Sequence, residues 1–219
     1  MAGGLPTTKN QLMNINLPKQ YISISQVNLW LQDSKKYIDR YFLELPEEPS
    51  IYMDFGKQFA TDCEAFIKDG QLNETFPTFY LDKMQPFIGK ESEKEIGLSI
   101  NGIQVRGFID VYDKDNNTVI DFKTSGKQWT QETLQSSLQM RTYALAMYTN
   151  GAEIPTSQIN WLETKVVNNA LQFTGRTDEI TYQFSMTEML QAVELIYETA
   201  VEISKEYDYF LMNKDKIYG

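Results

Sequence analysis

The sequence contains no histidine and only one cysteine, Cys63. Without histidine, a serine–histidine–aspartate triad, a histidine general base and an HExxH zinc site are all excluded. One cysteine cannot make an internal disulfide, a structural zinc site or a four-cysteine iron–sulfur cluster. Catalysis must therefore rely on carboxylates, lysines, hydroxyls and metal ions bound through oxygen.

Long apolar runs are also missing. No segment approaches the roughly 20 apolar residues that a membrane-spanning helix needs, and the polar N-terminus has no apolar signal segment. These absences predict a soluble, cytoplasmic protein without a membrane partner. The 219 residues, 42% of them hydrophobic, can bury one sizeable core. Because no linker is visible, we expect a single domain over residues 1–219, with 1–19 as a loose N-terminal arm.

Positive charge is scarce. The net charge of −10 argues mildly against a nucleic-acid partner, because phosphate binding needs local positive charge. The net charge does not show where the charges lie, however, and a carboxylate-rich metal site adds negative charges of its own. A basic groove could still be assembled from scattered cations, although most of them are more simply explained as solvated surface charges: Lys35, Lys36, Arg40, Arg106, Lys127 and Arg141.

The first half of the chain predicts two helices followed by strands. Ser25 is expected to cap a helix that carries apolar residues to Tyr37, and a second helix is expected from Asp54 to Lys68. Alternating apolar residues from Ile96 onward then predict three antiparallel strands. An Asn101-Gly102 pair and a polar turn at 113–117 join these strands, since Asn-Gly between alternating segments is a strong hairpin signal.

The second half returns to helices. A helix is expected over 130–149 and a strand over 158–167, followed by a turn at Asn168-Asn169 and a short strand near Leu171. Ser185 and Glu188 have the spacing of a capping box, which predicts the start of a long C-terminal helix. The order of elements indicates a mixed α/β fold.

Two carboxylates and one amine stand out in the central strands. Asp121 and Lys123 are two residues apart on a strand, so their side chains share one face. Asp110, at the end of Gly107-Phe108-Ile109-Asp110, is brought alongside by the turn. Carboxylates this close repel each other and raise one pKa unless a cation lies between them. Oxygen ligands without histidine or cysteine indicate Mg²⁺ or Mn²⁺.

These parts suit hydrolysis of a phosphodiester. Such a metal lowers the pKa of a bound water and offsets charge on a phosphate, and Lys123 could orient that water or stabilise the developing negative charge. The acid-x-lysine pattern alone is unspecific, because it also occurs at 33–35 and 163–165. The pattern at 121–123 differs from the other two in its context. It has apolar flanks, a Gly-x-x-Asp motif before it and a helix after it.

That following helix completes a set of motifs. Gln139 and Tyr143 are four residues apart and share a face, which an ordinary amphipathic helix would also explain. In order, Gly-x-x-Asp, apolar-Asp-x-Lys-Thr and Gln-Met-Arg-Thr-Tyr resemble the PD-(D/E)XK nuclease superfamily, specifically its RecB-like exonuclease branch. The Ser-x-Ser helix at Ser23 extends the resemblance, which reaches about Lys165. It implies a restriction-endonuclease-like α/β core, with a central mixed β-sheet flanked by helices in the order αβββαβ.

The resemblance also implies roles for individual residues. Asp110 and Asp121 are expected to bind the metal, together with the backbone carbonyl of Phe122, and Lys123 is expected to be the catalytic amine. Gln139 and Tyr143 are expected to line the site or touch DNA, and we add Arg141 between them as a DNA contact.

The chain departs from the family pattern in its second helix. Many RecB-like members place a histidine four residues after a glycine, but here Gly56 is followed by Ala60. Glu64, one turn later on the same face, either substitutes as a metal ligand or is simply solvated. At the start of the first strand, Glu93 or Glu95 could add one acidic group. We favour Glu95, because the alternation from Ile96 places it on the polar face.

Taken together, the resemblance implies a Mg²⁺-dependent deoxyribonuclease. An exonuclease is favoured because no target-reading segment is visible, with a role in DNA recombination, repair or phage DNA processing. DNA is the expected partner, and a homo-oligomer or a single-strand annealing or recombination partner stays open. The alternative is a non-catalytic DNA-end-binding or assembly protein that retains the fold. A third reading is an α/β domain in which Asp110 and Asp121 merely cap turns.

Overall fold

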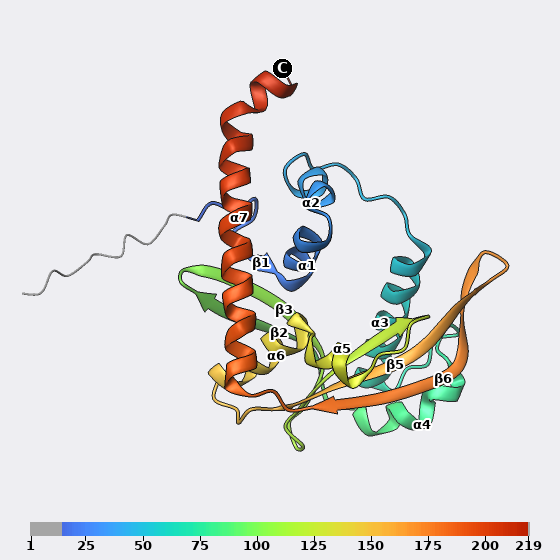
Figure 1. Ribbon diagram of the computed structural model, residues 1–219. Coiled ribbons are helices and arrows are strands. Elements are labelled where there is room, and N and C mark those ends of the chain that lie inside the picture. The colour runs from blue at the N-terminus through green and yellow to red at the C-terminus, as the bar shows by residue number, and fades with distance from the viewer. Residues whose placement is uncertain (1–14, 219) are drawn as a thin grey trace, which may run out of the picture.

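The structure is a computed structural model that describes residues 15–218, so residues 1–14 of the expected N-terminal arm lie outside it (Figure 1). The described chain opens with a two-residue strand, β1 (Ile22–Ser23), and three helices: α1 (Ile24–Gln32), α2 (Ser34–Tyr41) and α3 (Ile51–Asp69). Three short helical turns lead from α3 to the sheet, namely η1 (Thr78–Tyr80), α4 (Leu81–Met84) and η2 (Gln85–Phe87).

The strands form one mixed sheet. It contains β2 (Glu91–Ile100), β3 (Ile103–Asp113), β4 (Thr118–Ser125), β5 (Thr156–Val167) and β6 (Ala170–Tyr182) in addition to β1. β2, β3 and β4 pair antiparallel in succession, whereas β4 and β5 run parallel and are connected by α5 (Gln131–Gln135) and α6 (Leu138–Thr149). β6 pairs antiparallel with β5 and leads into α7 (Met186–Tyr218). The expected fold class, a mixed sheet flanked by helices, is confirmed.

Helices cover both faces of this sheet, as the alternation of β4 shows. Val119 packs into a cluster with Ala144 of α6, while the next residue, Ile120, packs into a different cluster with Phe66 of α3. Consecutive strand residues point to opposite faces. A third cluster joins α1, α2 and α7 to the β2–β3 hairpin. None of the helices in the part of the chain described here is long and apolar enough to cross a membrane.

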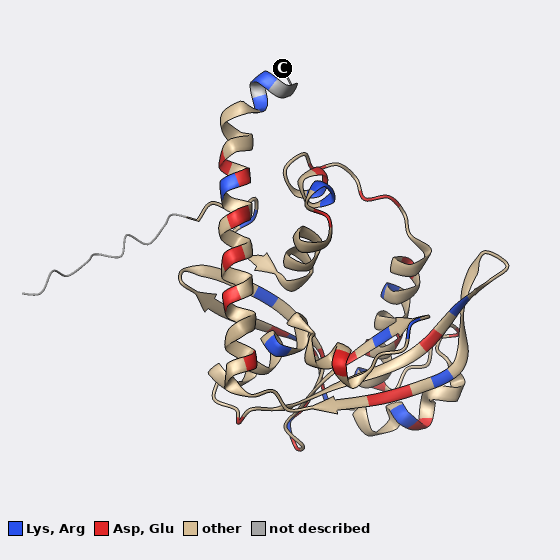
Figure 2. Cartoon of the chain, viewed as in Figure 1, with Lys and Arg blue, Asp and Glu red and all other residues tan. Residues whose placement is uncertain are grey.

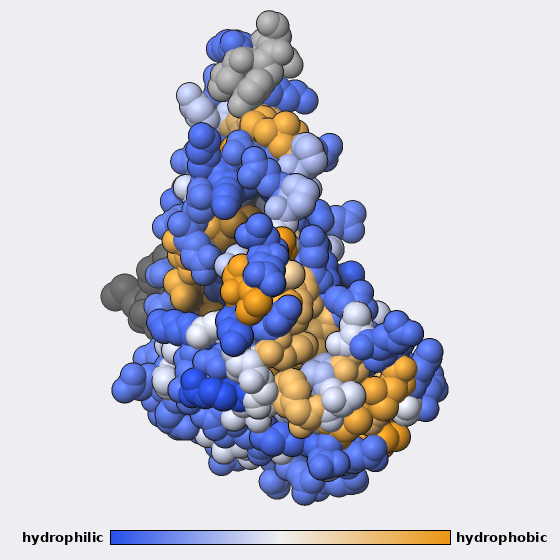
Figure 3. Space-filling model, turned by 90° about the vertical axis from the view of Figure 1, so that its right-hand side faces the viewer, coloured by the Kyte–Doolittle hydropathy of each residue, from blue (hydrophilic) through white to orange (hydrophobic). Residues whose placement is uncertain are grey.

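The β5–β6 hairpin is anchored on α3 through one aromatic residue. The ring of Phe173 in β6 lies 4.9 Å from that of Phe55, 5.3 Å from that of Phe59 and 6.0 Å from that of Phe79, measured between centroids. Figure 3 looks onto this side of the molecule and shows apolar surface gathered among polar side chains. Because the same helix carries Ala60 and Glu64, this packing fixes the position of both relative to the sheet.

The predicted turns are confirmed. Asn101 and Gly102 both have positive φ, at 48° and 89°, as the tightest hairpin turns require. Asn168 and Asn169 turn the β5–β6 hairpin in the same way, with φ of 51° and 61°. The β6 strand is longer than expected and extends to Tyr182.

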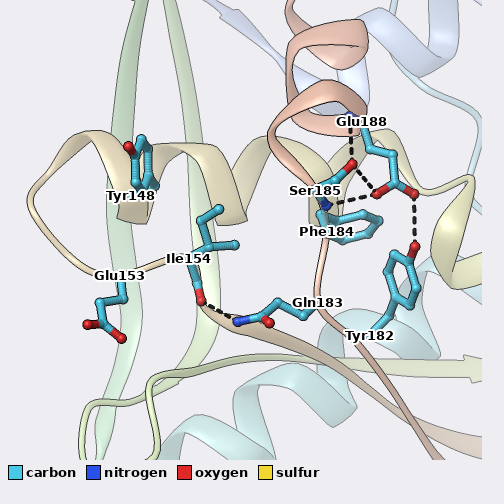
Figure 4. A pocket seen from close by; sticks show the side chains of 8 residues that line it. All are labelled: Tyr148, Glu153, Ile154, Tyr182, Gln183, Phe184, Ser185 and Glu188. Carbon is cyan, nitrogen blue, oxygen red and sulfur yellow. Dashed lines mark hydrogen bonds between the residues drawn. The ribbon is translucent and has the colours of Figure 1, made fainter.

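The capping box of the C-terminal helix is also confirmed (Figure 4). The Glu188 carboxylate accepts hydrogen bonds from the Ser185 amide at 2.8 Å and the Tyr182 hydroxyl at 3.0 Å, and the Ser185 hydroxyl accepts from the Glu188 amide at 3.3 Å. These residues line a pocket beside the first turn of α7. The Glu188 carboxylate therefore already occupies the position at the α7 N-terminus that favours a negative charge.

Two expected helices are each divided into two. The helix expected from Ser25 begins after Ser23, which is the true N-cap, and ends at Asp33, whose carboxylate caps α2 through the Lys36 amide at 3.0 Å. The helix expected over 130–149 breaks at Ser136 and Ser137, and Ser137 caps α6. Short polar side chains that bond to the backbone compete with a continuous helix, which explains both breaks.

Candidate active site

The site forms at a gap along one edge of β3. On the opposite edge of β3, β2 pairs with residues from Ile103 to Tyr112, with an interruption at Asp110. The edge that contains the gap is shared by two strands. β1 pairs there with Val105 and Arg106, and β4 pairs with residues 111–113. Among the described strands, none pairs with residues 107–110 on that edge. There the Phe122 amide of β4 donates instead to the Asp110 carboxylate, at 2.8 Å.

Asp121 lies at the centre of a network of side chains from β4 and α6. Its Oδ1 accepts a hydrogen bond from the Gln139 amide nitrogen at 2.9 Å, and its Oδ2 lies 2.7 Å from the Lys123 ammonium. Lys123 also donates to the Gln139 oxygen at 3.0 Å, and the Gln139 nitrogen donates to the Tyr143 hydroxyl at 2.9 Å. The expected pairing of Gln139 with Tyr143 thus holds both Asp121 and Lys123 in place.

The electrostatics show the strain of placing two carboxylates together. Burial and the neighbouring charge of Asp121 raise the pKa of Asp110 to about 8, against the lowering effect of the Phe122 amide. Burial lowers the pKa of Lys123, but Asp121 and Asp110 more than offset it, so that the net shift is upward. Lys123 is therefore a cation at neutral pH. Burial and Asp121 also raise the pKa of Tyr143, whose hydroxyl stays neutral.

A third acidic group, Glu93, lies across from Asp110. Its neighbours pair in register, Ser92 with Val111 and Lys94 with Ile109, while Glu93 itself leaves the ladder with a φ of 49°. A left-handed conformation in a residue other than glycine costs of order 1–3 kcal/mol and is concentrated at functional sites. Burial and the charge of Glu64 raise the pKa of Glu93.

Glu93 and Asp110 line a small cavity under α3. Its volume is about 10 Å³, which is room for one water-sized sphere. Glu64, Phe122 and Ala60 line it as well. Ala60, the position at which the family resemblance implied a histidine, presents only a methyl group to the cavity. Glu64 also forms an ion pair with Lys68 on the surface of α3.

Glu95 is not among the residues that line the cavity beside Asp110. It lies opposite Phe108, one pleat beyond the Glu93 position, and its half-exposed carboxylate faces Arg106 at 3.8 Å. The alternation of the strand placed it correctly on the polar face. Which of Glu93 and Glu95 lies beside Asp110 depends on the strand register and on the distorted backbone at Glu93. The alternation of apolar and polar residues reveals neither.

Arg141 is turned away from the site as well. Its guanidinium donates to the backbone carbonyl of Gln135 at the end of α5, at 2.8 Å from Nε. The cause is helix geometry: a residue two positions after Gln139 lies on a different face of α6. We therefore leave Arg141 out of the proposed DNA contacts.

Gly107 also shapes the site, although its place in the sequence motif does not by itself indicate a role. A Cβ atom at this position would lie 2.8 Å from Cε1 of Tyr143, closer than side-chain atoms approach each other. The missing side chain lets the Tyr143 ring lie directly on β3. The signal was available in the sequence, since the glycine belongs to the Gly-x-x-Asp motif and the tyrosine to the helix motif.

The residues at hand fit a hard divalent cation. No group of three or more His, Cys, Asp or Glu side chains is already arranged as a metal cluster within residues 15–218. However, the Asp121 carboxylate is buried, and its Oδ2 contacts the Lys123 ammonium at 2.7 Å and still has a lone pair for a cation. With Asp110 and the adjoining cavity, this gives oxygen donors and a space of ionic size, which Mg²⁺ and Mn²⁺ prefer.

Comparison with known proteins identifies the family. The sequence matches the model of the PD-(D/E)XK nuclease superfamily over residues 69–203, more than half of the chain, and the protein belongs to this superfamily. Members of the superfamily generally use divalent metal ions. No curated protein matches the sequence.

Solved structures share the fold at low sequence identity. A "Putative exonuclease" from Eubacterium rectale superposes with a TM-score of 0.52 at 12% identity, covering 93% of this chain and 88% of its own. The protein SSO0001 gives a TM-score of 0.50 at 16% identity, covering 83% and 75%. A phage-related exonuclease from Haemophilus somnus gives 0.47 at 12% identity, covering 87% and 82%. Family and fold together support a nuclease.

Proposed function

We propose that this protein is a Mg²⁺- or Mn²⁺-dependent deoxyribonuclease that digests DNA from its ends. The observation that carries the proposal is the meeting of Asp110, Asp121 and Lys123 at the gap in β3. Membership of the nuclease superfamily supports hydrolysis of a phosphodiester. The Eubacterium rectale neighbour is named an exonuclease, which favours action on DNA ends. We propose a role in DNA recombination, repair or phage DNA processing.

The metal would be held by the Asp110 and Asp121 carboxylates and the backbone carbonyl of Phe122. We assign the remaining acidic position to Glu93 or Glu64, because both line the cavity beside Asp110, and not to Glu95. A bound divalent cation supplies a Lewis acid, which lowers the pKa of water and offsets charge on the phosphate.

The chain itself supplies positioning and positive charge. Lys123 stays protonated, so it acts as a fixed cation beside the scissile phosphate, where it stabilises the developing negative charge. Gln139 contacts both Asp121 and Lys123 and keeps their spacing constant, and Tyr143 holds Gln139 from the other side. Because these contacts exist before substrate binds, little reorganisation is needed during the reaction.

The test uses the full chain with linear and circular DNA, single- and double-stranded, in Mg²⁺, Mn²⁺ or EDTA. We expect metal-dependent loss of linear DNA while circular DNA survives. Asp121→Ala and Lys123→Ala should each slow digestion on the order of 10²-fold or more. Lys165→Ala is the matched control, because it ends the other acid-x-lysine pair on a strand of this sheet and is exposed. Full activity in both site variants would refute the assignment.

A specific observation favours the second candidate, a non-catalytic DNA-end-binding protein. The described residues hold no preformed metal cluster, and Ala60 contributes no ligand to the cavity. Binding of DNA ends without cleavage under every metal tested would support this candidate over the nuclease.

A further inference from the structure

A groove next to the site has a lining that the proposed catalytic residues do not explain. It lies between β3 and the segment that runs from Lys19 through α1, with a volume of about 480 Å³, within the usual range for ligand sites. Gly107 and Phe108 lie at its β3 side, and Gln139 and Tyr143 at the end that contacts Asp121. The groove therefore borders the candidate active site and shares Gln139 and Tyr143 with it.

Phe108 presents an aromatic face in this groove. Its side chain is 51% exposed, although the next residue, Ile109, is fully buried. A single exposed apolar residue is ordinary on a protein surface. This one is set apart by its place: it lies two residues before Asp110 on the same strand face, in the stretch of β3 that neither β1 nor β4 pairs with.

Two cations of the groove are each held against an aromatic ring. The Arg106 guanidinium lies 5.1 Å from the ring centroid of Tyr21, and the Lys19 ammonium lies 5.3 Å from that of Tyr41. Cation–π contacts at such distances favour these positions of the charges, and both Lys19 and Arg106 are exposed. Glu95 is the single carboxylate in the lining, so the groove carries a net positive charge.

The negative charge of the protein lies largely elsewhere. α7 carries seven acidic and three basic residues, which accounts for four of the ten net negative charges of the chain. Figure 2 shows the acidic residues spread along this helix. The overall charge of −10 is therefore no obstacle to a locally positive groove.

We infer that this groove binds single-stranded DNA next to the scissile phosphate, with one base stacked on Phe108 and phosphates at Arg106 and Lys19. Cations that follow the backbone and aromatic rings that stack on bases are the two elements of sequence-independent single-strand binding. A duplex keeps its bases stacked inside, so it cannot use an aromatic platform of this kind. Short polar side chains in the lining, Ser23 at the N-cap of α1 and Ser25 and Asn28 within α1, add hydrogen bonds that require no particular base.

The spacing along β3 agrees with this assignment. Phe108 and Asp110 are two residues apart, about 7 Å along a strand. Successive nucleotides of a helical strand rise by about 3.4 Å. The base on Phe108 would thus be one or two nucleotides from the phosphate at Asp110. The inference rests on the proposed function, because it takes the scissile phosphate to lie there.

The test measures binding and digestion separately on the full chain. Binding of a fluorescein-labelled oligothymidine, and of a blunt duplex of the same length, is followed by anisotropy in EDTA. We expect Phe108→Ala to weaken oligothymidine binding about 5- to 100-fold, the effect of losing one stacking platform. Phe108→Trp should preserve binding. Tyr148→Ala, which removes a similarly exposed aromatic ring outside the groove, should leave it unchanged.

A second experiment tests the phosphate contact of Arg106, with Arg176 as a control in a similar setting. Arg106 faces Glu95 and stacks on Tyr21, while Arg176 faces Glu163 and stacks on Trp161. Arg106→Gln should reduce the slope of log affinity against log salt by about 0.7, the value for one phosphate contact on a single strand. Arg176→Gln, which makes the same change in net charge outside the groove, should leave the slope unchanged.

The outcomes separate the two proposals. Metal-dependent digestion with unaltered oligothymidine binding in both groove variants would overturn the groove assignment and leave the nuclease intact. Preference for the blunt duplex with no effect of Phe108→Ala would also overturn it. Loss of binding in the groove variants, with no digestion by the wild type under any metal, would support the groove and refute the nuclease.

Discussion

Asp110→Asn is expected to make the metal-free protein more stable at neutral pH. In the native protein the Asp110 carboxyl is buried beside Asp121, and its pKa rises from 3.8 to about 8. Asparagine has nearly the same shape, carries no charge to be buried, and its side-chain oxygen can still accept the hydrogen bond from the Phe122 amide. A residue proposed to bind metal would thus weaken the fold while the metal is absent.

The magnitude follows from proton linkage. Between about pH 4 and about pH 8 the native protein keeps the Asp110 proton that the unfolded chain has lost, so this group makes the free energy of unfolding fall as pH rises. The slope is at most about 1.4 kcal/mol per pH unit, and the accumulated cost at neutral pH is at most about 4 kcal/mol. Above about pH 8 the contribution is constant. Asp110→Asn removes both the cost and the slope.

Urea denaturation in EDTA, at several values between about pH 5 and about pH 8, measures this directly. Asp113→Asn is the matched control on the same strand. Burial raises the pKa of Asp113, but the Lys90 and Asn116 contacts more than offset it and hold that pKa below its usual value. This carboxylate stabilises the fold above its ordinary pKa, and the stabilisation is lost as pH falls through the lowered pKa. Asp113→Asn should therefore destabilise the protein at neutral pH.

Added Mg²⁺ completes the experiment. A cation that binds only the native state raises the stability of the wild type by mass action, and Asp110→Asn should abolish most of that gain. The reasoning is refuted if Asp110→Asn is no more stable than wild type in EDTA at neutral pH, or if its stability keeps the wild-type dependence on pH.

Three further predictions concern the same site. Gly107→Ala should slow DNA digestion at least about tenfold, because the new methyl group displaces Tyr143; an unchanged rate would contradict the proposed packing. Glu93→Gln should raise the Mg²⁺ concentration that gives half-maximal activity, whereas Glu95→Gln should not, and equal effects in a metal titration would rule out our choice between them. Mg²⁺ binding at pH 7 should release most of one proton from Asp110, detected by calorimetry in two buffers with different ionisation enthalpies; no release would show that Asp110 is already ionised.

Local signals in the sequence predicted the parts of the fold that depend on neighbouring residues. The Asn101-Gly102 hairpin, the Asn168-Asn169 turn and the capping box at Ser185 all follow from the conformational preferences of a few adjacent residues. The pairing of Gln139 with Tyr143 follows from helix periodicity in the same way. That periodicity also argued against Arg141, which lies two residues from Gln139 on α6.

What the sequence did not reveal depends on contacts between distant segments. β1 is only two residues long and has no sequence pattern of its own, yet its pairing with β3 bounds the gap that contains Asp110. The conformation of Glu93 is likewise set by the strand opposite, since alternation alone treats Glu93 and Glu95 as equivalent. Strand register, which no single segment determines, sets both the bounds of the gap in β3 and which of the two glutamates lies opposite Asp110.

The site and the groove have a common structural cause. Because β1 and β4 leave residues 107–110 unpaired on one edge of β3, with β2 on the opposite edge, the Asp110 carboxylate accepts a hydrogen bond from β4 and Phe108 lines the groove. Gly107, in the same gap, admits Tyr143, which holds Gln139 and through it Asp121. Binding of the metal and binding of single-stranded DNA therefore depend on one interruption of the sheet. A substitution that distorts residues 107–110 should impair both. Phe108→Ala should weaken DNA binding and leave unchanged the gain in protein stability that Mg²⁺ produces through Asp110.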